Sequence, residues 1–131
     1  MLDANALFLP VRRRFPLEAE IARLCPGAAI GVPSSVRDEL DRLVADGTPQ
    51  ATAARTMAER FPVVRARGRG DAAVLEAAVR RGAWVVTADR ALAARLVAVG
   101  VTVLVPRDRH RLERVMGALA PPARSGRRGN G

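Results

Sequence analysis

The sequence contains no lysine, and all 22 of its basic residues are arginines. This absence disfavours P-loop nucleotide hydrolases, Schiff-base enzymes and phospho-acceptor receiver domains, because each of these classes depends on a lysine ammonium group. The only cysteine is Cys25, so the chain has neither an intramolecular disulfide nor a cluster of thiolate metal ligands. This cysteine content fits a reducing compartment.

Aromatic residues and long apolar runs are also scarce. Aromatic residues make up 3% of the sequence and hydrophobic residues 49%, so the core must consist mainly of valine, leucine and alanine. Few rings are therefore present to stack on nucleic-acid bases. Charged residues interrupt the first apolar run, and no run approaches the length of a transmembrane helix. We expect a cytoplasmic protein that does not enter a membrane.

What the sequence has in excess is positive charge, with a formal net charge of +9 over 131 residues. This length suits one domain with a sizeable core, and we predict a single domain in residues 1–120 followed by a flexible basic tail in residues 121–131. The planar guanidinium group suits bidentate contacts with phosphate. A strongly basic chain attracts polyanions, so nucleic acid is the expected partner.

Short apolar runs alternate with helical periodicities along the chain. We expect strands in residues 1–3, 28–32, 62–64, 84–87 and 101–105, and an apolar turn in residues 7–10. Helices are predicted for residues 16–25, 34–46 with Ser34 or Ser35 as the N-cap, 50–60, 71–81, 89–99 and 108–119. The last helix should bury Leu112, Val115, Met116 and Leu119. This alternation predicts an α/β fold with a parallel sheet covered on both faces.

Two aspartates point inward from the first turns of their helices. Successive residues rotate by ~100° about a helix axis, so the angle of each side chain follows from its position. Asp71 falls in the middle of the apolar stripe of its helix, and Asp89 does the same on the next helix. Taken singly, either could be a helix N-cap that satisfies backbone N–H groups.

Two further acids could reach the same rim of the sheet. Glu39 lies at the margin of the apolar face of its helix, whereas Asp38 points toward solvent. Asp3 follows the first strand. Carboxyl ends of parallel strands meet at one edge of a sheet, where ligands bind. Carboxylates that converge there repel each other unless their pKa values rise or a cation binds, and Mg²⁺ prefers oxygen ligands. An acidic metal site in a basic protein is suited to phosphodiester hydrolysis.

Four segments together resemble the PIN-domain ribonucleases over roughly residues 1–115. They are Leu2-Asp3-Ala4-Asn5, Val36-Arg37-Asp38-Glu39-Leu40, Gly70-Asp71-Ala72-Ala73 and Val86-Thr87-Ala88-Asp89-Arg90. The chain looks most similar to compact archaeal proteins related to the eukaryotic small-subunit rRNA-processing endonucleases, and more distantly to VapC-like toxins.

The resemblance implies a three-layer α/β sandwich with a parallel five-stranded sheet, and a metal-dependent endoribonuclease that hydrolyses single-stranded RNA, with rRNA processing as one role. One or two Mg²⁺ or Mn²⁺ ions would be held by Asp3, Glu39, Asp71 and Asp89. Asn5 and Thr87 match supporting polar positions. Ala4 and Ala88 stand where relatives often have a hydroxyl residue and an asparagine.

Two arginine clusters are candidates for binding single-stranded or structured RNA. Arg65, Arg67 and Arg69 directly precede Asp71, and Arg12, Arg13 and Arg14 form a second run. Either cluster is otherwise a solvated run of charge. Two alternatives to the enzyme stay open: an RNA-binding module that keeps the fold without turnover in a ribosome-assembly complex, and a toxin paired with an antitoxin. The resemblance is also compatible with a homodimer.

Overall fold

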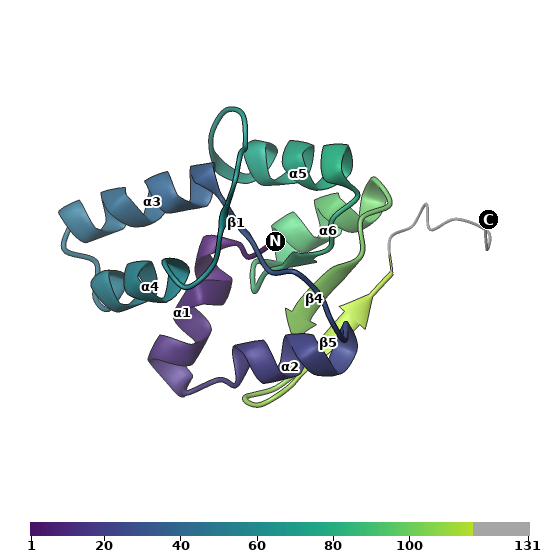
Figure 1. Ribbon diagram of the computed structural model, residues 1–131, viewed down its shortest axis with the longest axis horizontal. Helices are drawn as coiled ribbons and strands as arrows, with labels where there is room; N and C mark the ends of the chain where they lie inside the picture. The colour runs from purple at the N-terminus through teal and green to yellow at the C-terminus, as the bar shows by residue number, and fades with distance from the viewer. Residues whose placement is uncertain (117–131) are drawn as a thin grey trace.

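The computed structural model describes residues 1–116, in which six helices alternate with five short strands (Figure 1). The helices are α1 (Ala4–Arg13), α2 (Leu17–Leu24), α3 (Ser34–Ala45), α4 (Ala51–Ala58), α5 (Gly70–Arg81) and α6 (Arg90–Ala98). The strands are β1 (Val32–Pro33), β2 (Val63–Val64), β3 (Val85–Val86), β4 (Val103–Pro106) and β5 (Leu112–Val115). None of these helices is both long and apolar enough to span a membrane. The predicted tail, residues 121–131, lies outside the described residues, and the domain boundary stays a prediction.

The strands form two small sheets, so the expectation of one parallel five-stranded sheet is wrong. Strands β1 and β2 pair in parallel, and the second sheet has the order β3-β4-β5. Within it β3 and β4 are parallel, whereas β4 and β5 are antiparallel. The α/β class is confirmed, but the sheet is divided and its last strand runs in the opposite direction.

Residues 1–3 lie between the two sheets and join them. The N–H of Leu2 donates to the carbonyl of Gly31, 3.0 Å away, just before β1. On the other side, the N–H of Asp3 donates to the carbonyl of Val86 at 3.0 Å. The N–H of Val86 donates to the carbonyl of Met1 at 2.8 Å. The first segment therefore bridges β1 and β3, and Asp3 emerges at the carboxyl end of β3.

Two prolines end strands, and one glycine allows two strands to approach closely. Pro33 ends β1 and Pro106 ends β4, since proline has no N–H to continue a ladder. Of the strand predicted for residues 28–32, only Val32 is in a strand, β1. A Cβ on Gly31 would stand 2.5 Å from Cγ2 of Val64, so glycine allows β1 to approach β2 closely.

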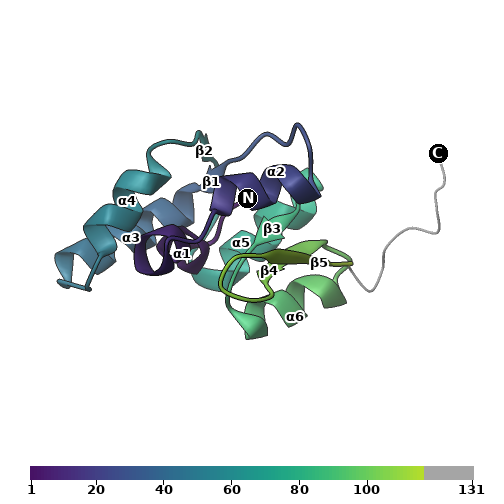
Figure 2. The ribbon, with the colours of Figure 1, turned by 90° about the horizontal axis from the view of Figure 1, so that it is seen from below.

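Helices cover the three-stranded sheet on both faces. Figure 2 shows α2 on one side of β3, β4 and β5 and α6 on the other, while α1, α3 and α4 gather beside the sheet. Contacts of α2 with β5 and of α6 with β4 agree with this arrangement. The core between these layers consists mainly of valine, leucine and alanine, as the composition predicted.

The first helix replaces a predicted turn. Residues 7–10 were expected to form an apolar turn because a proline follows a short apolar run. They lie instead inside α1, with Pro10 within the helix. Leu7, Phe8 and Leu9 are buried, and α1 packs against α4. Burial of this apolar segment offsets the hydrogen bond that Pro10 cannot donate.

The predicted closing helix, residues 108–119, is also wrong. After Pro106 the chain turns back and forms β5, which pairs with β4 in the register Val103 to Val115 and Pro106 to Leu112. Leu112 is buried as expected, but Val115 is 36% exposed and Met116 is 52% exposed. Leu119 lies outside the described residues.

Candidate active site

The four acids singled out from the sequence line one cavity of about 280 Å³. Each comes from a different part of the fold: Asp3 precedes α1, Glu39 lies on α3, Asp71 lies in the first turn of α5, and Asp89 precedes α6. The rest of the lining is Ala4, Asn5, Phe8, Arg12, Leu43 and Thr48. Residues far apart in sequence therefore form one acidic cavity at the carboxyl ends of the parallel strands.

Thr87 connects two of the acids through its buried hydroxyl group. Its Oγ1 lies 2.9 Å from Oδ2 of Asp3 and 3.1 Å from Oδ1 of Asn5, and it accepts the N–H of Asp89 at 3.0 Å. Oδ1 of Asn5 also accepts the N–H of Ala88 at 2.7 Å. Thr87 is completely buried, so these bonds fix the Asp3 carboxylate and the turn before α6 relative to one another.

The N-cap interpretation holds for one aspartate and fails for the other. Oδ1 of Asp89 accepts the N–H groups of Ala91 and Leu92 at 2.9 and 3.1 Å, so Asp89 is the N-cap of α6. Its carboxylate nevertheless lines the cavity. The N-cap of α5 is Arg69 rather than Asp71, which lies in the first turn. Glu39 is half-buried and lines the cavity, whereas its neighbour Asp38 is exposed.

Burial and mutual repulsion change the acidity of two carboxyl groups. Burial raises the pKa of Asp3, and the charges of Asp71 and Asp89 add to this rise, while hydrogen bonds from Thr87 and from the N–H of Ala4 oppose it. Burial also raises the pKa of Glu39, with a further increase from Asp3 and Asp71 and an opposing effect of Arg42. Asp71 and Asp89 thus oppose ionisation of the Asp3 carboxyl group, and Asp3 and Asp71 oppose that of Glu39, in the direction of a raised pKa.

The donor set partly fits a divalent ion. All candidate ligands are oxygens, as Mg²⁺ and Mn²⁺ prefer, and a cation would offset the repulsion among the carboxylates. As the side chains stand, however, residues 1–116 contain no group of three acidic, histidine or cysteine side chains close enough to hold one ion. An ion at this cavity would therefore be held by fewer carboxylates with the help of waters, or the side chains would have to move together.

A family model described as a PIN-like domain matches residues 1–109. The chain belongs to the PIN-like domain family. Proteins with this domain generally act on RNA and are typically metal-dependent nucleases. No curated protein matches the chain significantly. Membership agrees with the resemblance in the four acidic segments, all of which lie within the matched residues.

The arginines of this PIN-like domain divide between several places. Arg12 lines the acidic cavity, where its guanidinium also stacks 4.1 Å from the ring centroid of Phe8. Arg65, Arg67 and Arg69 are exposed in the connection between β2 and α5 and do not line the cavity. Arg14 ends α1 in a left-handed conformation and is exposed. Of the predicted RNA-binding arginines, only Arg12 contacts the cavity of the acids.

Ser34 positions the loop that precedes Asp71, instead of capping its own helix as predicted. Its Oγ accepts the N–H of Ala66 at 2.9 Å and donates to the carbonyl of Ala66 at 3.2 Å. The N-cap position of α3 is Pro33, which has no capping side chain. The hydroxyl therefore ties the beginning of α3 to the connection that carries the chain into α5.

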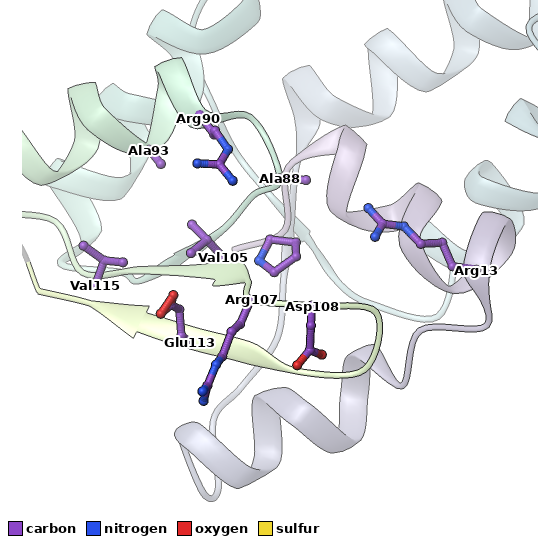
Figure 3. A pocket seen from close by; sticks show the side chains of 10 residues that line it. Arg13, Ala88, Arg90, Ala93, Val105, Arg107, Asp108, Glu113 and Val115 are labelled. Atoms are coloured by element: carbon purple, nitrogen blue, oxygen red, sulfur yellow. The ribbon is translucent and has the colours of Figure 1, made fainter.

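The structure has a second cavity of about 550 Å³, and Figure 3 shows residues that line it. Its lining includes Arg13, Arg90 and Arg107, of which only Arg13 was predicted as a binding residue. Arg90 directly follows a site aspartate in the sequence, and this position was the available signal for it. Arg107 gave no such signal, because it was expected just before a helix and lies instead in the hairpin between β4 and β5.

Proposed function

We propose that this PIN-like domain is a metal-dependent endoribonuclease that hydrolyses phosphodiester bonds in single-stranded RNA. The observation that carries the proposal is the shared cavity: four acids from four segments, separated by as many as 86 positions, line the same space. Four carboxylates in one cavity repel one another, and a cation that binds there during function would offset this repulsion. Family membership supports an action on RNA.

In this proposal Asp3, Glu39, Asp71 and Asp89 would hold one or two Mg²⁺ or Mn²⁺ ions. The chemistry supplied by a bound ion is activation of water and neutralisation of charge on the leaving oxygen. Asp3 is positioned by the hydroxyl of Thr87, and Asn5 holds the Ala88 N–H at the turn before Asp89. Arg12, which lines the same cavity, would bind the phosphate of the strand that enters it.

The test is cleavage of a 5′-labelled single-stranded RNA by Asp71→Asn in Mn²⁺ and in Mg²⁺. Asp71 accepts no hydrogen bond that caps α5, so the amide should leave the helix intact while removing a candidate ligand. We expect a fall in cleavage rate of at least 10²-fold, the order associated with loss of one catalytic electrostatic contact. Asp38→Asn, an exposed change on α3, is the matched control and should cleave like the original chain. Equal cleavage by Asp71→Asn would contradict the proposal.

Ribosomal RNA is the substrate we propose to try first, with transfer RNA as the comparison. Mapping the 5′ and 3′ ends of the products would distinguish a defined processing cut from general degradation. A defined cut in ribosomal precursor RNA supports a processing role, whereas uniform degradation of both RNAs contradicts it.

A binding module without turnover is the second candidate. The observation that favours it is the spacing of the acids, since no three of them in residues 1–116 stand close enough to share an ion. This candidate predicts RNA binding that is equal with and without divalent ions, and no cleavage in Mg²⁺ or Mn²⁺. Cleavage that requires an ion and is lost in Asp71→Asn would exclude it.

A further inference from the structure

The second cavity adjoins the acidic one at the Ala88–Asp89 turn. Ala88 lines the second cavity and Asp89 the first. Two consecutive residues near the end of α1 also line different cavities: Arg12 lines the acidic cavity, and Arg13 lines the second cavity. Two pairs of consecutive residues thus face the two spaces, which makes the cavities adjacent.

Three arginines from three elements surround the second cavity. Arg13 comes from the last turn of α1, Arg90 from the first turn of α6, and Arg107 follows β4. Figure 3 shows Arg13 and Arg90 extending toward Ala88 from opposite sides, whereas the Arg107 side chain extends away from these two. All three side chains are exposed, and none of them forms an ion pair within residues 1–116. Their charges are therefore available to a ligand.

Two acids reduce this positive charge without cancelling it. Oδ1 of Asp108 accepts the N–H groups of His110 and Arg111 at 2.8 and 2.9 Å, so this carboxylate stabilises the hairpin turn. Glu113, on β5, is exposed at the rim. With three arginines and two acids the lining carries one net positive charge, in contrast to the acidic cavity, where Arg12 faces four acids. One phosphodiester group, with a single negative charge, matches the second cavity.

We propose that the second cavity binds a phosphodiester group of the RNA strand next to the one positioned at the four acids. This inference rests on the proposed function, because it assigns the second cavity to the same substrate. The remaining lining is Ala88, Ala93, Val105, Pro106 and Val115, which includes no aromatic ring. Without a ring to stack on a base, the contact is with backbone phosphate and sugar, and it is independent of base sequence.

The first experiment measures binding without cleavage. A fluorescein-labelled single-stranded RNA of mixed sequence is titrated with the protein in EDTA, and fluorescence anisotropy gives the affinity. Arg90→Gln and Arg13→Gln should each weaken binding about threefold or more and make the slope of log affinity against log salt less negative by about 0.7. Glu113→Gln, which removes a negative charge at the rim, should strengthen binding. Arg95→Gln, on the same helix as Arg90 but outside this lining, is the matched control and should bind like the original chain.

A second readout separates this proposal from the proposed function. In Mn²⁺, Arg90→Gln should raise KM for RNA cleavage and leave kcat within about twofold, since binding and not chemistry is altered. Suppose that the original chain never cleaves RNA, but that in EDTA Arg90→Gln weakens RNA binding and Glu113→Gln strengthens it. This result would refute the proposed nuclease activity and support the phosphate site. Binding by Arg90→Gln and Arg13→Gln equal to that of Arg95→Gln would overturn the phosphate site, whatever the cleavage result.

Discussion

At the scale of single residues, Thr87 contributes more to the arrangement of the acids than any other uncharged side chain of the cavity region. Its hydroxyl contacts a carboxylate, an amide oxygen and a backbone N–H that belong to three different residues. The group is fully buried, so no water can replace these contacts. The orientation of Asp3 therefore depends on one oxygen atom that is 84 positions away in sequence.

We expect Thr87→Val to lose both activity and stability. Valine keeps the shape but leaves Asp3 and the Asp89 N–H without their hydrogen-bond partner, at a cost of about 1–3 kcal/mol in the free energy of unfolding. Cleavage of RNA in Mn²⁺ should fall at least tenfold because Asp3 is no longer held in place. Denaturant unfolding and initial cleavage rates measure the two effects.

Thr102→Val is the matched control for that change. Thr102 is a buried threonine that precedes β4, at the opposite end of the strands from the acids, and its Oγ1 has only a long contact of 4.0 Å with Sδ of Met116. Cleavage by Thr102→Val should match that of the original chain. An equal loss of activity in both variants would mean that Thr87 acts through overall stability alone.

At the scale of elements, the edge strand β5 is secured by two side chains of α2. Oε1 of Glu20 accepts the N–H of Leu112 at 2.9 Å, and Arg23 donates to the carbonyl of Leu112 at 2.9 Å. Arg23 also donates to both carboxylate oxygens of Glu20, at 2.8 and 3.0 Å. The pair thus satisfies the backbone groups of Leu112 that face away from β4, as a neighbouring strand would do.

This pair predicts a loss of stability in acid. Hydrogen bonds from Arg23 lower the pKa of Glu20 to about 2, and the Leu112 N–H adds to this effect. Because the pKa is lowered from 4.5 in the unfolded chain, the stabilisation is complete above about pH 4.5 and is lost as the pH falls toward about 2. Glu20→Gln should lower the free energy of unfolding at pH 7 by about 1 kcal/mol and flatten its dependence on pH in this window.

Urea unfolding at several pH values checks the prediction for Glu20. Glu18→Gln, on the same helix, is the control: Glu18 pairs with Arg60, and both side chains are well exposed. Its effect should be below about 0.5 kcal/mol. Identical pH dependence of Glu20→Gln and the original chain would refute the assigned role of Glu20.

The elements differ in how well local patterns predict them. The helix predicted for residues 71–81 is confirmed as α5, because its apolar spacing and its terminal Gly82 are both local signals. A turn was predicted for residues 7–10, which lie in α1, and a helix for the segment that forms β5. Both predictions were wrong because tertiary contacts determine the structure of these segments. Burial against α4 favours a helix despite Pro10, and the contacts with β4 and Glu20 favour a strand where Leu112, Val115 and Met116 have helical spacing.

The candidate site was easier to predict than the sheet. Each acid was predicted from the angle of its side chain on a helix or from its position after a strand. Neither property changes when the strands pair differently from the prediction. The cavity that Arg90 and Arg107 line was not predicted, because it depends on the position of the β4–β5 hairpin. Hydrogen bonds such as that from Thr87 to Asp3 have no local signal other than residue type.

At the scale of the whole molecule, charge is distributed unevenly. Four of the 13 acidic residues line one small cavity, while 22 arginines are spread over the chain. RNA binding should therefore be dominated by arginine contacts with phosphate, and its affinity should fall about twentyfold between 50 and 200 mM salt if three phosphates are contacted. An uncharged peptide nucleic acid of the same sequence should not bind. Fluorescence anisotropy in EDTA at several salt concentrations measures the affinity for RNA and tests for binding of the peptide nucleic acid. An affinity for RNA that does not change with salt would contradict the expectation that arginine–phosphate contacts dominate binding.

Residues 1–3, which join the two sheets, also determine when during synthesis the acids can come together. Their partner Val86 and the hydroxyl that orients Asp3 are made more than 80 residues later. A nascent chain emerging from the ribosome therefore carries Asp3 without Thr87 or Asp89 beside it until those later residues have been made. Long-range pairing of this kind forms late, because the intervening loop must close first. The acidic cavity is thus incomplete on a nascent chain next to ribosomal RNA until residues 87–89 have been made.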